Sequence, residues 1–517
     1  MNNNLQTILI IDYGSQYTQL IARRIRELEV FCLVYPYHKI TNKLLNNIKP
    51  SAFILSGGPK SVLDKNSPRL NRSIINKKKP ILAICFGMQL ISKNFKGKIK
   101  QATNREYGYT LINIKKKSAI FKGIKKNKFK VWMSHGDNIN KIPVSFSISS
   151  LSDNKIISSI ENTKSKIYCL QFHPEVYHTD YGLKIINNFV FNIVKIKIRF
   201  RIKKFIETKI LELKNQLKEK RIICGLSGGV DSTVTAYLLD KAVNKNLFCI
   251  FVDHGLLRKN ESNEVSKIFK KKFGSNFIKV DASTIFLTRL KNIYDPEKKR
   301  KIIGKTFIEV FEKEAKKITN VKFLGQGTLY PDVIESIPFF GGPTAKIKSH
   351  HNVGGLPKKM KLKVVEPLRE LFKDEVREVG RNLKINKYLL LRHPFPGPGL
   401  AIRIPGIIDK KKISILKEAD YIFINYLKEK KLYNKIWQAF VVLLPIKSVG
   451  VMGDERTYNY VASLRAITSV DGMTADFYMF NNKQLKEISS LLINNVKGIN
   501  RVLYDFTSKP PGTIEWE

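Results

Sequence analysis

Three residues in the N-terminal part of the chain have the types and spacing for nucleophilic catalysis: Cys85, His173 and Glu175. Cys85 follows an apolar run at 80–84 and precedes a helical pattern, so it lies on a strand-to-helix turn where the helix N-terminus favours its thiolate. His173 and Glu175 flank Pro174 on an extended segment and project to the same side. We predict that Cys85 is a nucleophile, that His173 transfers protons and that Glu175 orients His173.

A glycine pair provides a candidate site for a developing oxyanion. Gly57 and Gly58 leave their backbone N–H groups unobstructed, and the amide of Phe86 follows the nucleophile directly. A lone histidine is more often structural, and the other four cysteines are expected to be small core thiols. The strand-to-helix cysteine, the His-Pro-Glu triplet and the glycine pair together favour catalysis.

A second motif has the chemistry of a phosphate site. The motif follows an apolar strand at 222–226 and opens a helix that runs to about Val243, and it comprises Ser227, Gly228, Gly229, Val230, Asp231, Ser232 and Thr233. Glycines let backbone amides approach a phosphate chain, and the helix N-terminus attracts it. Asp231 is a candidate ligand for Mg²⁺. No lysine follows a second glycine, so this is not the Walker sequence.

Strands that run into Gly-bearing turns alternate with helical patterns in both regions. Apolar runs at 7–11, 52–55 and 80–84 are followed by such turns, and the pattern starts again at Arg221. We predict an α/β protein with two doubly wound parallel-sheet domains followed by a smaller α+β C-terminal domain. A basic connection and a turn-rich segment at 393–399 place the domains at 1–195, 196–393 and 394–517.

The composition is that of a folded protein with an unusual charge. The 517 residues contain 92 Lys plus Arg and 43 Asp plus Glu, a net charge of +49. The lysines are dispersed, as an A+T-biased coding sequence would produce, so we expect no nucleic-acid partner. Five cysteines without a C-x-x-C pair argue against a disulfide framework or a structural zinc site. With no secretory signal and no apolar run of about 20 residues, we expect a cytoplasmic protein without membrane contact.

The region that contains Cys85, His173 and Glu175 resembles the class I glutamine amidotransferases over about 8–191. The Ser227–Thr233 motif resembles the PP-loop of the ATP pyrophosphatases. Segments at 347–357, 392–400, 449–454 and 509–517 resemble the glutamine-hydrolysing GMP synthetases, so the resemblance covers nearly the whole chain. It implies that MgATP adenylates the C2 oxygen of XMP and that ammonia from glutamine then displaces AMP. The implied substrates are XMP, ATP and glutamine, with Mg²⁺ as cofactor and ATP as co-substrate.

The resemblance also implies roles for further residues. The glutamine pocket would be bordered by Gln89, Ser134, His135, Gly136 and Asp137, and XMP would be bound by Arg501, Lys509 and Glu517. Asp332 and Glu335 match an acidic pair, and 348–357 matches a lid over the substrates. The family is commonly dimeric through its C-terminal domain, so we expect a homodimer; the apolar run 439–444 suits an interface or a core strand. Two positions depart from the family pattern: Ala83 occupies a position where the family usually has glycine, and His254 one where it usually has asparagine.

Two other classes of function remain open from the sequence. A PP-loop enzyme that modifies transfer RNA would suit the positive charge but would not need Cys85, His173 and Glu175, so glutaminase activity distinguishes it. A basic, non-catalytic nucleic-acid-binding protein would show a steep dependence of binding on salt.

Overall fold

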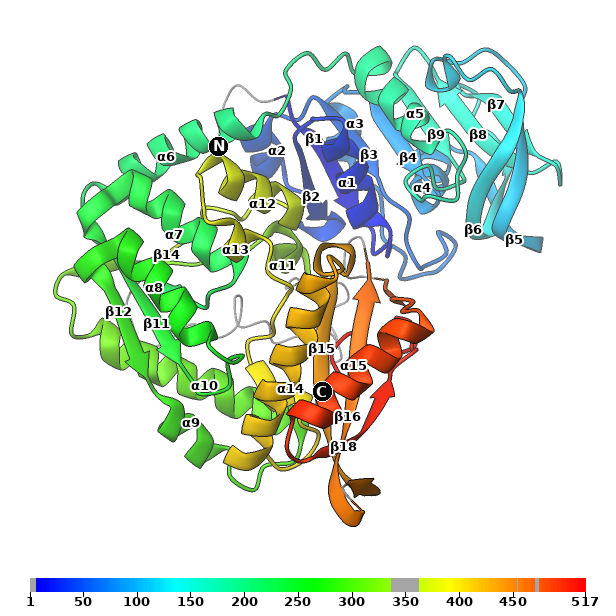
Figure 1. Cartoon of the computed structure of the whole chain (residues 1–517). Coiled ribbons are helices and arrows are strands. Elements are labelled where there is room, and N and C mark those ends of the chain that lie inside the picture. Colours follow the sequence, from blue (N-terminus) through cyan, green and yellow to red (C-terminus); the bar gives the residue numbers. More distant parts are fainter. Residues whose placement is uncertain (1–5, 336–361, 453, 470–473) are drawn as a thin grey trace. The chain divides into compact units, whose positions relative to one another are not determined.

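The computed structural model describes residues 6–335, 362–452, 454–469 and 474–517 (Figure 1). These residues form two compact units. The N-terminal unit contains the chain up to Phe205, and the C-terminal unit contains Ile206–Val333 together with the described residues from 362 onwards. Within the described ranges, no helix combines the length and apolar character that crossing a membrane requires.

The N-terminal unit is built on a nine-stranded sheet with the order β2-β1-β3-β4-β9-β8-β7-β5-β6. Its first five strands in this order are mutually parallel. They are almost wholly apolar and buried, as expected for parallel strands covered on both faces. These strands and their helices are β1 (Ile8–Asp12), α1 (Thr18–Glu27), β2 (Cys32–Pro36), α2 (Asn42–Ile48), β3 (Ala52–Leu55), α3 (Arg72–Asn76), β4 (Ile81–Ile84), α4 (Phe86–Asn94), β9 (Ile167–Leu170) and α5 (Gly182–Asn187).

The other four strands of this sheet extend it in the antiparallel sense. They are β5 (Lys98–Ile114), β6 (Lys128–Lys141), β7 (Ser147–Ser152) and β8 (Ile157–Asn162). The sequence does not predict this antiparallel half, because the polar faces of β5 and β6 break the apolar runs by which strands are recognised. The extension matters for function because β6 carries Ser134, His135, Gly136 and Asp137.

The C-terminal unit contains a five-stranded parallel sheet with the order β12-β11-β10-β13-β14. Helix α10 shows how the sequence sets a boundary: Asp295 accepts a hydrogen bond from the Lys298 amide, and Pro296 begins the helix. The elements from the unit boundary to the end of this sheet region are α6 (Ile202–Leu217), β10 (Arg221–Leu226), α7 (Val230–Val243), β11 (Leu247–Asp253), α8 (Glu261–Phe273), β12 (Phe277–Asp281), α9 (Ser283–Arg289), α10 (Pro296–Ala315), β13 (Val321–Gly325), α11 (Tyr330–Glu335), β14 (Lys363–Val365), α12 (Lys373–Asn382) and α13 (Lys387–Leu390).

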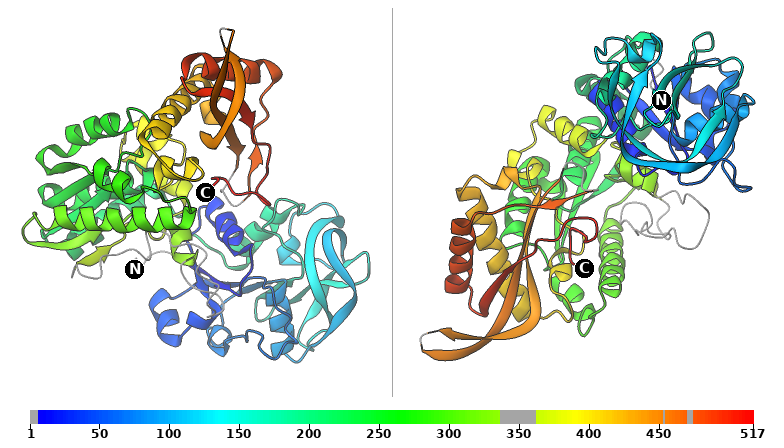
Figure 2. Two further views of the ribbon diagram at one scale, coloured as in Figure 1. Left: turned by 90° about the horizontal axis from the view of Figure 1, so that it is seen from below. Right: turned by 90° about the vertical axis from the view of Figure 1, so that its right-hand side faces the viewer.

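The last part of this unit has a smaller mixed sheet. Strands β15 (Gln438–Met452) and β16 (Glu455–Thr468) form a long antiparallel hairpin that projects from the unit (Figure 2), and β18 (Ile499–Tyr504) pairs with β16 in parallel. The remaining elements are α14 (Lys410–Glu429), β17 (Asp476–Phe477) and α15 (Asn482–Asn495). Helix α14 begins at Lys410 because the Asp409 side chain caps it by accepting from the Lys412 amide.

The fold class is confirmed: two sheets built on parallel strands and helices, the first of them extended by four antiparallel strands, precede a smaller part with a mixed sheet. The parallel sheet of the C-terminal unit and the part after residue 393 share one hydrophobic core, which includes Ile223, Ile250, Leu416 and Val441. The division at 393 therefore stays a prediction. All five cysteines are buried, and none of them forms a disulfide within the described part of the chain.

Candidate active sites

Cys85 lies on a strained turn between β4 and α4. Its backbone has φ 52° and ψ −107°, in the positive-φ region that non-glycine residues rarely adopt. The turn is held by a hydrogen bond from the Cys85 amide to the Leu170 oxygen at 2.7 Å. Gly87 allows α4 to start close to β3, since a Cβ there would lie 2.7 Å from the Leu55 oxygen. The neighbouring departure, Ala83, is fully buried within β4.

His173 lies within hydrogen-bonding reach of Cys85, and Glu175 contacts His173 from the other side of Pro174 in the chain. His173 Nδ1 is 2.7 Å from Glu175 Oε1, and both side chains are buried. Burial would lower the pKa of His173, but the charges of Glu175 and Cys85 and hydrogen bonds to both raise this pKa well above its ordinary value. A protonated imidazole beside a cysteine sulfur is the arrangement by which a histidine activates a cysteine nucleophile.

The backbone of Gly57 and Gly58 lies next to the site formed by Cys85, His173 and Glu175. A Cβ on Gly57 would lie 3.1 Å from His173 Cε1, and one on Gly58 would lie 3.0 Å from the Tyr13 oxygen and 3.2 Å from the Phe86 ring. Side chains at these positions would crowd the site, so the absence of a Cβ keeps the backbone close to Cys85 and His173.

The predicted glutamine-pocket residues also converge on this region. Cys85 Sγ lies 3.5 Å from the Ser134 oxygen, and Gln89 Nε2 donates to the Asp137 oxygen at 3.1 Å. His135 contacts the Asp137 oxygen through Nδ1, and the Asp137 carboxylate accepts a hydrogen bond from Ser61. Gly136 follows His135 on β6, and a Cβ there would lie 3.7 Å from Tyr107 Oη.

Three further residues next to this site were not predicted from the sequence. Gln171 Nε2 lies 3.7 Å from Cys85 Sγ, and the Tyr17 ring packs edge-on to His173 with centroids 5.0 Å apart. Glu106 on β5 lies 3.1 Å from His135 Nε2 and is buried. Gln171 is two residues before His173 and could have been found from that proximity. Glu106 and Tyr17 carry no signal in the sequence because the fold alone places them.

The second site begins with the Ser227–Thr233 segment, which connects β10 to α7 as predicted. Gly228 has φ +74°, which glycine adopts without strain. Ser232 Oγ lies 3.0 Å from Ser227 Oγ and accepts from the Ser227 amide, and Thr233 Oγ1 donates to the Gly229 oxygen at 2.7 Å. These contacts close a compact loop at the N-terminus of α7, where Val230 and Asp231 form the first turn.

Asp231 forms an ion pair that the sequence does not reveal. Lys373 Nζ, at the start of α12, lies 2.6 Å from Oδ1 and 2.5 Å from Oδ2 of Asp231. The two side chains are partly exposed. Lys373 thus adds a cation beside the loop amides, which suits a polyphosphate ligand.

One further predicted segment borders the same loop, and two other residues named from the sequence have contacts near their own strands. A Cβ on Gly327 would lie 3.0 Å from the Asp231 carbonyl carbon, so the chain after β13 packs directly on the start of α7. Asp332 Oδ2 accepts from the Leu329 amide at 2.9 Å. His254 is buried, and burial lowers its pKa to about 4. In this neutral form its Nδ1 accepts from the Leu256 amide at 3.1 Å.

The three predicted XMP residues lie in the C-terminal part of the chain. Arg501 is exposed on β18, and Lys509 pairs through its backbone with Ala475. Glu517 contacts Lys299 Nζ at 2.5 Å and accepts from the Gly406 amide, so the described end of the chain packs against the C-terminal unit. The lid at 348–357 and the side chain of Glu335 lie outside the described residues.

Family comparisons agree with these two constellations. Three family models match: Glutamine amidotransferase class-I over residues 9–193, NAD synthase over 199–306, and GMP synthase C terminal domain over 425–516. The fold and the matches define a glutamine-dependent enzyme with an amidotransferase part and an ATP-using part.

Curated relatives match the whole chain. The "GMP synthase [glutamine-hydrolyzing]" of Brachyspira hyodysenteriae (strain ATCC 49526 / WA1) is 52% identical over 517 residues, 100% of both chains. Its namesake from Bradyrhizobium diazoefficiens is 52% identical over 99% of this chain and 93% of that protein, and the one from Bartonella quintana (strain Toulouse) is 51% identical over 99% of both. The chain belongs to the glutamine-hydrolysing GMP synthase family. It is a ligase with glutamine as amido donor and ATP as co-substrate.

Proposed function

We propose that the chain converts XMP, ATP, glutamine and water to GMP, AMP, pyrophosphate and glutamate, using the residues assigned below. The observation that carries the proposal is the presence, on one chain with full-length relatives of this name, of both the Cys85 group and the Ser227–Thr233 loop. We keep the division at 1–195, 196–393 and 394–517 as the functional one.

Glutamine is hydrolysed at the Cys85 group. The Cys85 thiolate attacks the side-chain carbonyl carbon of glutamine, and amides near Gly57, Gly58 and Phe86 stabilise the oxyanion. His173 gives its proton to the departing nitrogen, so ammonia leaves and a thioester remains. His173 then takes a proton from water as the water attacks the thioester, which releases glutamate and restores Cys85. Gln89 and the 134–137 segment border the substrate.

The ammonia replaces an activated oxygen at the second site. The C2 oxygen of XMP attacks the α-phosphorus of ATP, pyrophosphate leaves, and ammonia then attacks C2 and expels AMP. Amides of the Ser227–Thr233 loop bind the departing phosphates, and Lys373 can exchange its contact with Asp231 for a phosphate oxygen.

A magnesium ion fits this site by its donor chemistry. Asp231 offers a partly exposed carboxylate, the kind of oxygen donor that Mg²⁺ prefers. No group of three His, Cys, Asp or Glu suited to a metal occurs among the described residues, so phosphate oxygens and water would supply the other ligands. The ion would offset charge on the pyrophosphate.

The C-terminal part has features of a dimer interface. Within the predicted apolar run 439–444, residues 439–443 of β15 are buried. Exposed apolar side chains lie instead further along the hairpin, at Val449, Val451 and Tyr458. A homodimer that covers them stays a proposal, as does a cytoplasmic location.

Replacing Glu175 by Gln should slow glutamine hydrolysis and shift its pH dependence. Loss of the carboxylate removes the charge that raises the pKa of His173, so this pKa falls and the corresponding limb of the kcat/KM profile moves to lower pH. Orienting groups of this kind contribute up to about 10⁴-fold. We expect a smaller loss than for His173→Ala, measured as glutamate release between pH 5 and 10. An unchanged profile would remove Glu175 from the mechanism.

Lys509→Ala should raise the apparent KM for XMP by about tenfold or more, because a charge-assisted contact to the phosphate is lost. A matched control is Lys497→Ala, at an exposed lysine of the same C-terminal part. Equal XMP requirements in the two variants contradict the assignment of Lys509.

A point substitution at Lys509 tests XMP binding more specifically than deletion of residues 509–517 does. Glu515 pairs with the buried Arg403, and Glu517 pairs with the buried Lys299. Deletion removes both carboxylates. Arg403 keeps its contact with Asp420 at 3.8 Å, but breaking the buried Lys299–Glu517 pair costs roughly 3–5 kcal/mol. A truncated chain therefore reports on stability as well as on XMP binding.

The proposed reaction is tested by asking whether product formation requires XMP. With glutamine and MgATP, formation of AMP and pyrophosphate should require XMP and should match GMP one to one. Product formation that requires transfer RNA and ignores XMP would favour the tRNA-modifying alternative.

A further inference from the structure

We propose that Arg392 is a positioning residue that fixes the orientation of the Gly228–Gly229 peptide and connects this loop to the C-terminal part of the unit. This inference rests on the proposed binding of ATP phosphates by the Ser227–Thr233 loop. Arg392 follows α13 and directly precedes the turn-rich 393–399 segment.

The contact with the loop is direct. Arg392 Nη1 donates to the Gly228 oxygen at 2.8 Å, and a Cβ on Gly228 would lie 3.0 Å from that nitrogen. A peptide group is planar and trans, so its C=O and N–H point in opposite directions. Holding the Gly228 oxygen therefore also fixes the direction of the Gly229 N–H, one of the amides assigned to phosphate binding.

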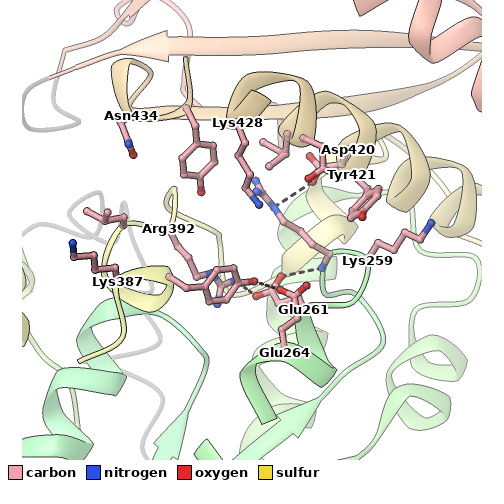
Figure 3. Close-up of a pocket in the computed structure, with 15 residues that line it drawn as sticks. Lys259, Glu261, Glu264, Lys387, Arg392, Asp420, Tyr421, Lys428 and Asn434 are labelled. Carbon is pink, nitrogen blue, oxygen red and sulfur yellow. Dashed lines mark hydrogen bonds and ion pairs between the residues drawn. The ribbon is translucent and has the colours of Figure 1, made fainter. Parts of the chain in front are cut away.

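Arg392 is itself held in place. Its Nη2 pairs with Glu261, whose side chain is 4% exposed, and Figure 3 shows this pair in the wall of a cavity. Glu261 Oε2 also accepts from the Arg258 amide at 3.0 Å, in the segment after β11. The guanidinium thus bridges two loops that follow neighbouring strands of the sheet.

The adjacent residue makes the connection to the C-terminal part. His393 Nδ1 accepts from the Ala439 amide of β15 at 3.2 Å, and its Nε2 lies 2.8 Å from the Tyr433 oxygen. Burial lowers the pKa of His393 to about 4, so the ring is neutral, with Nε2 as donor and Nδ1 as acceptor. The His393 and Tyr433 rings stack with centroids 3.8 Å apart.

These contacts give two neighbouring residues different partners. Arg392 holds the loop that binds ATP phosphates, and His393 holds β15 in the part to which XMP binding is assigned. Any displacement of Arg392 and His393 therefore changes the positions of the phosphate-binding loop and of β15 together. Arg392 contacts the loop, so we expect it to act through the direction of the loop amides.

The test compares Arg392→Ala, Arg392→Lys and the control Arg289→Ala in ammonia-dependent GMP synthesis by the full chain. Arg289 pairs with Glu309 on the exposed surface of the same unit. We expect Arg392→Ala to raise the KM for ATP by about tenfold or more, since a charged hydrogen bond is lost. Arg392→Lys should be intermediate, because an ammonium cannot hold Gly228 and Glu261 with the same fork geometry. Arg289→Ala should match the wild type.

The measurements separate positioning from a general loss of structure. A merely structural role lowers the active fraction, and thus kcat, without changing the KM for ATP, whereas positioning raises that KM more than the KM for XMP. Glutamine hydrolysis in the N-terminal unit serves as an internal control. If Arg392→Ala is too unstable to assay, Arg392→Lys carries the test.

The proposal is overturned if the assayable Arg392 variant has a KM for ATP within twofold of the wild type. If Asp231→Asn nevertheless abolishes synthesis, only the role of Arg392 fails. If Asp231→Asn is also fully active, the assignment of the loop itself fails.

Discussion

Cys85→Ala should abolish GMP formation from glutamine while leaving synthesis from ammonium salt close to the wild-type rate. The substitution removes the sulfur that forms the thioester, and no other nucleophile lies at the β4–α4 turn. Loss of a nucleophile that works with a positioned base costs about 10⁶-fold in kcat in the best-studied hydrolase. Residual glutamine-dependent activity should be below detection.

The control for this variant is Cys32→Ala. Cys32 is also buried in the N-terminal unit, but on β2, where its Sγ donates to the Ala22 oxygen. This variant should keep glutamine-dependent synthesis. Loss of both nitrogen sources in Cys85→Ala would contradict separate sites for hydrolysis and amination.

Asp231→Asn should eliminate GMP synthesis from either nitrogen source. The carboxylate is the proposed ligand of Mg²⁺ against the departing pyrophosphate, and it also holds Lys373 beside the loop. Loss of a group that stabilises transition-state charge costs about 10²- to 10³-fold, and loss of the metal as well should exceed this. Glutamine hydrolysis should persist, because its residues lie in the other unit.

Asp240→Asn is the matched control, since Asp240 lies on the same helix and pairs with Lys272. It should keep synthesis near the wild-type rate. Pyrophosphate release by Asp231→Asn at the wild-type rate would remove this loop from the adenylation step.

The parts of both sites that the sequence predicts are local in the chain. Cys85 is recognisable because its strand, turn and helix are consecutive, and His173 and Glu175 are two residues apart. The Ser227–Thr233 loop is recognisable for the same reason. In each case, the spacing of residues within one short segment already determines which side chains can come into contact.

Contacts between distant segments could not be predicted in this way. Lys373 and Asp231 are 142 residues apart, and Arg392 and Gly228 are 164 apart. In a chain with a net charge of +49, neither cation stands out from the surface lysines and arginines. Only the order β12-β11-β10-β13-β14 brings the starts of α7 and α12 and the end of α13 to the same loop.

The antiparallel half of the N-terminal sheet shows a different limit. Its strands alternate polar and apolar residues, and β6 places His135 beside Glu106, 29 residues earlier on β5. The register of that hairpin depends on cross-strand packing and a bulge, which residue types alone do not specify.

The central claim is that nitrogen released at Cys85 becomes the 2-amino group of GMP made by the same chain. The most direct measurement supplies purified protein with XMP, MgATP and glutamine labelled with ¹⁵N in its side-chain amide, and determines the mass of the GMP formed. The account predicts labelled GMP from the wild type, and from Cys85→Ala only unlabelled GMP when ammonium salt is added. Labelled GMP from Cys85→Ala, or no GMP from the wild type with either nitrogen source, would contradict it.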